Sequence, residues 1–178
     1  MLAPAHSRTR IIRRLLLAGW SIVATAPAAG QAFTARVARV DDGRTVEVIA
    51  ENDSKTRTVR LLALEIAGLP ETASSRSRKN LAGWALNRTV TVEWFPSSPN
   101  LPSSPKNDLI VGRLWLGSTD LGLMQISTGF ARHDREQLAD EPTNERTLYT
   151  EAEQRAKDHH YGMWKTSGPD PWQTLATK

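Results

Sequence analysis

The stretch that decides the fold covers residues 33–64 and reads FTARVARVDDGRTVEVIAENDSKTRTVRLLAL. Apolar and polar side chains alternate over Phe33–Val40 and again over Thr45–Ala50, which is the period of a half-buried strand. Asp41-Asp42-Gly43 and Glu51–Lys55 consist largely of turn residues and separate these two segments from each other and from Thr58–Leu64. The stretch therefore predicts an antiparallel meander of three strands.

Downstream of the meander, the same periodicity predicts two more strands, Thr89–Phe95 and Leu109–Leu116. The segment Pro96–Asn107 between them is rich in proline and serine and predicts an exposed loop. Five short strands, with helices after the third and the fifth, predict a mainly β fold with some α structure. We expect a five-stranded OB-type barrel packed with about three helices.

The three helices are predicted from apolar spacing and capping residues. The first is capped by Ser74 or Ser75 and runs to about Asn87, with a buried stripe of Leu81, Trp84 and Ala85. The second begins at Thr119 or Asp120 and stops at Gly129. The third begins at Thr143 or Asn144 and ends at Gly162, with Leu148, Ala152 and Ala156 on its buried face.

The N-terminal segment differs from the rest of the chain. Basic residues up to Arg14 precede the short apolar run Leu15–Ala24 and then a run of small residues, the order of a secretory signal peptide. An uncleaved N-terminal anchor is the alternative. We therefore divide the chain into a signal peptide at 1–32, a domain at 33–166 and a tail at 167–178. We expect an exported monomer, periplasmic or secreted, with no stable membrane partner after cleavage.

The net charge of the 178-residue chain is +4, from 23 basic and 19 acidic residues. Residues 1–32 hold four arginines and no acidic residue, so 19 basic and 19 acidic residues remain from Phe33 onward. The domain is formally neutral, and a bulk electrostatic attraction to nucleic acid is not expected. The chain has no cysteine, which excludes disulfides, thiolate nucleophiles and cysteine-based metal sites.

Five short motifs occur in the order of a known family. They are Asp42-Gly43-Arg44-Thr45-Val46, Arg60-Leu61-Leu62-Ala63-Leu64-Glu65, Val111-Gly112-Arg113-Leu114, Gly129-Phe130-Ala131 and Tyr161-Gly162-Met163-Trp164. In this order and spacing they resemble the staphylococcal nuclease family of thermonuclease-like domains, from about Phe33 to Trp164. The resemblance implies an OB barrel and a calcium-dependent nuclease, a hydrolase of phosphodiester bonds in nucleic acid.

The resemblance also implies roles for individual residues. Arg60 and Arg113 fall on the two arginines that clamp the phosphate, a task that suits the planar guanidinium. Glu65 falls on a metal-binding aspartate, and Asp42 stands beside the metal position. The general-base glutamate falls on Gly68 in an ungapped alignment, whereas a three-residue insertion puts Glu71 in that role. A solvated loop residue is the alternative for Glu71.

The main departure from the family is Arg44, which stands where the family keeps a second aspartate as metal ligand. A guanidinium has no acceptor atom and cannot coordinate calcium, so calcium binding as in the family should be badly weakened. We hypothesise that Arg44 replaces the ion as a fixed positive charge and is the third arginine of a cluster that binds the substrate phosphate with Arg60 and Arg113. An ordinary ion pair at the barrel rim is the alternative for Arg60.

Two functions follow from these residues, and whether the chain is an enzyme stays open. The first is an exported thermonuclease-like phosphodiester hydrolase acting on nucleic acid. The second is a catalytically inactive OB-fold module that binds an anionic, phosphate-bearing ligand or a protein partner in the periplasm. Two smaller signals remain. Arg76, Arg78 and Lys79 form a basic cluster that could meet a phosphate backbone or simply be a solvated helix face, and His133 is expected at the surface.

Overall fold

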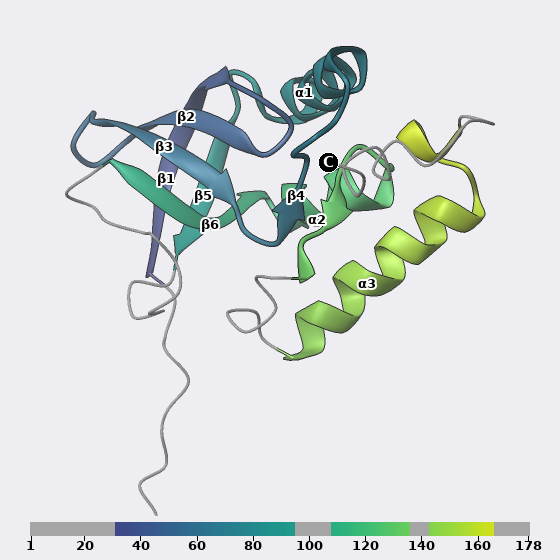
Figure 1. Ribbon diagram of the computed structural model, residues 1–178. Coiled ribbons are helices and arrows are strands. Elements are labelled where there is room, and N and C mark those ends of the chain that lie inside the picture. The colour runs from purple at the N-terminus through teal and green to yellow at the C-terminus, as the bar shows by residue number, and fades with distance from the viewer. Residues whose placement is uncertain (1–30, 95–107, 136–142, 166–178) are drawn as a thin grey trace, which may run out of the picture.

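The computed structural model describes residues 31–94, 108–135 and 143–165 (Figure 1). The predicted signal peptide lies outside these residues except for Gln31 and Ala32. The loop Pro96–Asn107 and the tail 167–178 lie outside them entirely. Figure 1 shows a β-barrel at one side of the molecule, α1 beside its upper end, and α2 and α3 packed on each other at the other side. Among the described residues, no helix is long and apolar enough to cross a membrane.

The barrel is closed and has five strands, as the sequence predicts. They are β1 (Gln31–Val40), β2 (Thr45–Ala50), β3 (Thr56–Leu61), β5 (Thr89–Trp94) and β6 (Leu109–Leu116). The neighbours run in the order β3-β2-β1-β5-β6, and a parallel pairing of β3 with β6 closes the cylinder. The other four pairings are antiparallel. This order, with a helix between the third and fourth barrel strands, defines an OB-type barrel.

Three two-residue strands were not predicted. They are β4 (Leu64–Glu65), β7 (Thr119–Asp120) and β8 (Arg132–His133). The predicted third strand, Thr58–Leu64, is therefore wrong at its end, because the chain turns after Leu61 and Ala63 takes a positive φ of 63°. This turn sends β4 away from the barrel, where it pairs antiparallel with β8. Glu65 consequently lies between the barrel and the helical layer.

The helices are α1 (Glu71–Ala85), α2 (Leu121–Ser127) and α3 (Thr143–Asp158), and a short 3-10 helix, η3 (Gly162–Lys165), follows. The predicted cap of α1 at Ser74 or Ser75 is wrong, because the helix begins directly after Pro70. Proline suits a helix start, where no backbone N–H donor is required. The predicted cap of α2 at Asp120 is confirmed, since its Oδ1 accepts the N–H groups of Gly122 and Leu123 at 2.7 and 3.2 Å.

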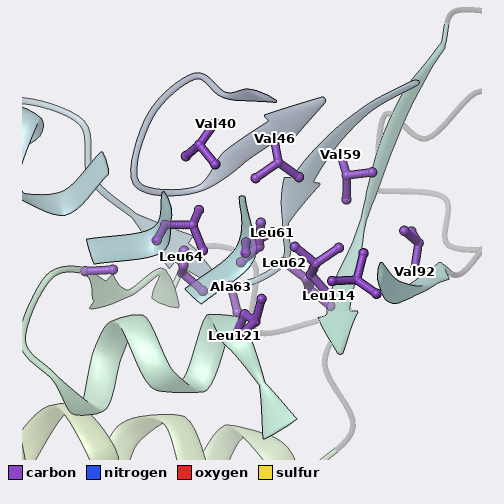
Figure 2. Packing of buried hydrophobic residues seen from close by; sticks show 14 of the residues in the cluster. Val40, Val46, Val59, Leu61, Leu62, Ala63, Leu64, Val92, Leu114 and Leu121 are labelled. Atoms are coloured by element: carbon purple, nitrogen blue, oxygen red, sulfur yellow. The ribbon is translucent and has the colours of Figure 1, made fainter. Parts of the chain in front are cut away.

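The core fills the barrel and continues into the layer between the barrel and α2. Figure 2 shows Val46, Val59, Val92 and Leu114 inside the barrel and Leu64 and Leu121 where the core reaches α2. Two predicted core residues are wrong. Trp84 is 42% exposed, because α1 buries Ser77, Leu81 and Ala85 instead, and Leu148 is 47% exposed, because α3 turns Tyr149 inward.

Candidate functional site

The turn between β1 and β2 is held rigidly between two helices. Oδ1 of Asp42 accepts the N–H of Arg44 at 2.8 Å, which closes the turn locally. Gly43 is buried, and a Cβ placed on it would lie 1.7 Å from Oγ of Ser77 in α1. From α2, Nε2 of the fully buried Gln125 donates to the carbonyl of Gly43 at 2.7 Å. These contacts fix the backbone of the turn and therefore the position of the Arg44 Cα.

The side chain of Arg44 reaches β4. Its Nη1 donates to the carbonyl oxygen of Leu64 at 3.1 Å and lies 3.9 Å from Oε1 of Glu65. The side chains of Arg44 and Glu65 are only 20% and 21% exposed, so solvent screens this ion pair less than one at the surface. Oε1 of Glu65 also accepts the backbone N–H of Ala67. Arg44 thus places a positive charge against one carboxylate and one carbonyl oxygen.

Arg60 and Arg113 share the outer face of the barrel. Arg60 of β3 is in register with Val111 of β6, and Arg113 is the next residue of β6 on the same face. Backbone hydrogen bonds link the segments that carry the three arginines. The N–H of Leu61, next to Arg60, donates to Arg44 O, and the N–H of Leu62 donates to the carbonyl of Gly112, next to Arg113, each at 2.8 Å. The three backbones are thus neighbours, whereas the side chain of Arg44 is directed to β4.

The two arginines of this face have different surroundings. Arg113 is 6% exposed, and its Nη1 lies 3.5 Å from Oε2 of Glu93, its cross-strand partner. The same oxygen accepts Nε1–H of Trp115 at 3.0 Å. Arg60 makes no hydrogen bond or ion pair with another described residue, and its Nε is buried. A buried guanidinium donor without a partner is costly, so Arg60 is suited to bind an anion.

The structure does not join Glu71 to these arginines. Glu71 is the first residue of α1 and is exposed, and it makes no hydrogen bond or ion pair with another described residue. Its carboxylate interacts favourably with the helix N-terminus. Gly68 is an exposed turn residue with φ of 74°, a conformation that glycine adopts without strain.

The donor set near Arg44 does not fit a calcium ion. Calcium takes six to eight oxygen ligands, and the two candidate carboxylates here belong to Asp42 and Glu65. Asp42 already accepts the N–H of Arg44, and the Arg44 guanidinium lies at Glu65 and holds the Leu64 carbonyl. Across the residues described, no three carboxylate or histidine side chains are grouped to hold a metal ion. A cation brought there would be repelled by the guanidinium.

A cavity of about 440 Å³ adjoins Glu65 on the side of α3. Its lining holds as many cationic as anionic side chains: Arg132, Arg135 and Lys157 against Glu65, Asp134 and Glu153, with His133 between them. Glu153 lies 3.8 Å from Arg135 and 3.1 Å from Lys157. Sequence reasoning missed this cavity, because only the pairing of β4 with β8 brings Arg132 beside Glu65. No local pattern in the sequence signals that pairing.

The prediction that His133 lies at the surface is wrong. The side chain is 3% exposed, and its Nδ1 lies 3.1 Å from Oγ1 of Thr150. Its ring packs against Tyr149, with 5.6 Å between the ring centroids. Tyr149 in turn donates its hydroxyl to Oδ2 of Asp120 at 2.5 Å. His133 therefore belongs to the contacts that hold α3 against β8 and α2.

Comparison with known proteins adds no family to this geometry. No protein-family model matches the chain, and no curated protein matches it. The fold and the site define a class of protein: an OB-type barrel with a rigid turn between β1 and β2, an ion pair of Arg44 with Glu65, and Arg60 and Arg113 on one outer face.

Proposed function

We propose that the chain is an exported, thermonuclease-like OB-fold module that binds a phosphate-bearing ligand, such as single-stranded nucleic acid, without calcium-dependent hydrolysis. The observation that carries this proposal is the position of the Arg44 guanidinium, which donates to Leu64 O and lies 3.9 Å from the Glu65 carboxylate. The resemblance puts a calcium ion at this position, and a calcium-dependent reaction requires carboxylates free to hold it. A fixed guanidinium supplies positive charge there but no site for a metal-bound water.

Phosphate binding is assigned to the face that holds Arg60 and Arg113. Arg60 supports it most strongly, because its buried Nε donates to no described residue. Arg113 contributes charge from the adjacent position, while Glu93 fixes its orientation. The domain is formally neutral from Phe33 onward, so affinity depends on these few arginines rather than on bulk charge. Export is part of the same proposal and is supported by the N-terminal pattern of the first 32 residues.

A second candidate is a phosphodiester hydrolase that uses Arg60 and Arg113 on the phosphate and Glu71 as general base. One observation favours it: Glu71 is exposed and unpaired among the described residues, so its carboxylate is free to accept a proton from water. In that mechanism the two arginines would stabilise the charge that develops on the phosphate oxygens.

One experiment separates the two functions. A fluorescein-labelled 12-nucleotide oligothymidine is mixed with the purified protein in calcium or in chelator, and both anisotropy and strand length are recorded. We expect binding of equal affinity in both buffers and no cleavage. Arg60→Ala should weaken binding about tenfold or more, the worth of a hydrogen bond to a charged group. Arg36→Ala removes an exposed arginine elsewhere on the barrel and should have little effect.

The contrary outcomes are distinct. Cleavage that requires calcium and disappears in Arg60→Ala would contradict the binding module and support the hydrolase. Cleavage in chelator that Glu71→Gln abolishes would support a calcium-independent hydrolase. Absence of both binding and cleavage at high protein concentration would refute nucleic acid as the ligand of this face.

A further inference from the structure

A groove of about 510 Å³ lies between the end of β1 and α1, which Figure 1 shows beside each other. Its apolar lining consists of Ala38 and Val40 from β1, Ala82 from α1 and Leu86, which directly follows α1. Leu86 is 41% exposed, so a large apolar surface is available to a ligand. The groove is independent of the face that holds Arg60 and Arg113, and none of its lining residues is needed for the proposed function.

One wall of the groove is an open strand edge. The ladder between β1 and β5 ends at Arg36 and Thr89, and the N–H and C=O of Val37 then bond to Arg88 and Asn87. Beyond this point, Ala38 lies at an irregularity of the register, and Arg39 and Val40 are paired with β2 alone among the described strands. The N–H of Asp41 donates to Thr45 in β2, so the alternation of the strand directs the backbone groups of Val40 away from β2, on the side where the ladder with β5 has ended.

The rim of the groove has an excess of positive charge. The positive charge of Arg39 is compensated, because nitrogens of its guanidinium lie 2.6 Å from the carboxylates of Asp41 and Glu47. Arg78 and Lys79 are exposed and make no ion pair with another described residue. In the cavity beside Glu65, by contrast, acidic and basic side chains balance. The groove is therefore a place where this neutral domain presents uncompensated cations.

We propose that this groove binds an extended acidic segment of a partner protein. The segment adds a short strand beside Val40, its carboxylates meet Arg78 and Lys79, and an apolar side chain covers Leu86. Addition of a strand to an open edge provides affinity through main-chain hydrogen bonds, and the neighbouring side chains provide selectivity. A phosphate backbone would use the two cations alone, because it has no peptide groups to pair with the strand. The combination of edge, apolar lining and cations thus favours a peptide over nucleic acid.

The test uses a fluorescein-labelled octapeptide of alternating glutamate and valine, titrated with the purified protein. Its counterparts are the same peptide with glutamine for glutamate, a version with N-methylated backbone amides, and oligothymidine. We expect the glutamate peptide to bind at least about tenfold more tightly than the glutamine peptide, and N-methylation to abolish binding. Arg78→Glu/Lys79→Glu should weaken binding of the glutamate peptide by a similar factor.

The matched control is Arg36→Glu/Lys55→Glu, which makes the same change in charge at exposed residues outside the groove. It should leave peptide affinity within about twofold of wild type, since distant surface charges are screened. Equal losses in the two double variants, or equal affinity for the glutamate and glutamine peptides, would overturn the proposal. Loss of oligothymidine binding with peptide binding unchanged would instead make the rim a phosphate-binding surface.

A second measurement does not depend on the folding of a variant. Amide hydrogen exchange of Val40 in the wild-type protein should slow when the glutamate peptide is added, because the added strand protects that N–H. Unchanged exchange at Val40, with saturating peptide, would exclude strand addition at this edge.

Discussion

Arg44, in the turn that leads into β2, and Arg60, on the neighbouring strand β3, differ in the bonds that their guanidinium groups already make. Arg44 is bonded to the Leu64 carbonyl and lies 3.9 Å from the Glu65 carboxylate. Arg60 buries its Nε without a partner among the described residues. The guanidinium of Arg44 thus already bonds to groups of the fold, whereas that of Arg60 keeps donors for a ligand. The comparison shows that an arginine whose backbone lies next to that of Arg60 is not by itself available for phosphate, because the side chain of Arg44 is directed to β4.

The largest effect is expected where the structure fixes Arg44. Gly43→Ala introduces a Cβ that meets Oγ of Ser77 at 1.7 Å, so either the turn or α1 must move. We expect a loss of about 3 kcal/mol in the free energy of unfolding, measured by denaturant titration. Gly83→Ala is the matched control, because its Cβ meets no atom within 4 Å, and it should stabilise α1 by about 0.5–1 kcal/mol. Equal effects of the two substitutions would contradict a rigidly held turn.

A smaller effect distinguishes the two arginines directly. Arg44→Met removes the donor to Leu64 O and leaves Glu65 without its cation, and we expect a loss of about 1–2 kcal/mol. Arg60→Met removes a buried donor that has no described partner, so stability should be unchanged or slightly higher. Chemical denaturation of both variants measures the difference. The comparison fails if Arg60→Met is the more damaging substitution.

The smallest effect concerns a third arginine, Arg57, which serves as a reference because it forms an ordinary ion pair with Asp53, four residues away. Its Nη2 donates to Asp53 at 2.5 Å, and this hydrogen bond holds the pKa of Asp53 below its usual range. The pair therefore stabilises the fold above the ordinary aspartate pKa, and the contribution is lost as the pH falls through the lowered value. A carboxyl NMR titration should show the pKa of Asp53 rising in Arg57→Gln. An unchanged pKa of Asp53 in this variant would show that the hydrogen bond from Arg57 does not cause the lowered value.

The barrel could be predicted from the sequence because its strands alternate sharply between apolar and polar residues. Val46 and Val48, for example, point into the core, and their neighbours do not. The end of β3 could not be predicted, because the apolar run Leu61–Leu64 continues through a turn and all four residues are buried. Trp84 was wrongly predicted to be buried, because the spacing of apolar residues along α1 does not show which of them face the barrel and which lie at the edge of the buried face.

The candidate site was predictable in its residues but not in its contacts. Arg44 could be recognised as a departure from the motif that the sequence resembles, yet its bond to Leu64 O depends on the turn that directs β4 away from the barrel. Glu71 was proposed from a three-residue insertion, and the sequence could not show that α1 begins at this residue. The pairing of Glu65 with Arg132 joins segments far apart in the chain, so no local pattern reveals it.

The central claim is that Arg44 takes the place of a bound cation, and thermal unfolding in calcium and in chelator tests it most directly. We predict that the Tm of the wild-type protein is the same in both, because the guanidinium already lies at Glu65. Arg44→Asp restores an acidic ligand beside Asp42 and Glu65, so its Tm should rise when calcium is added. A calcium-dependent rise in the wild-type Tm, with none in Arg44→Asp, would contradict the account.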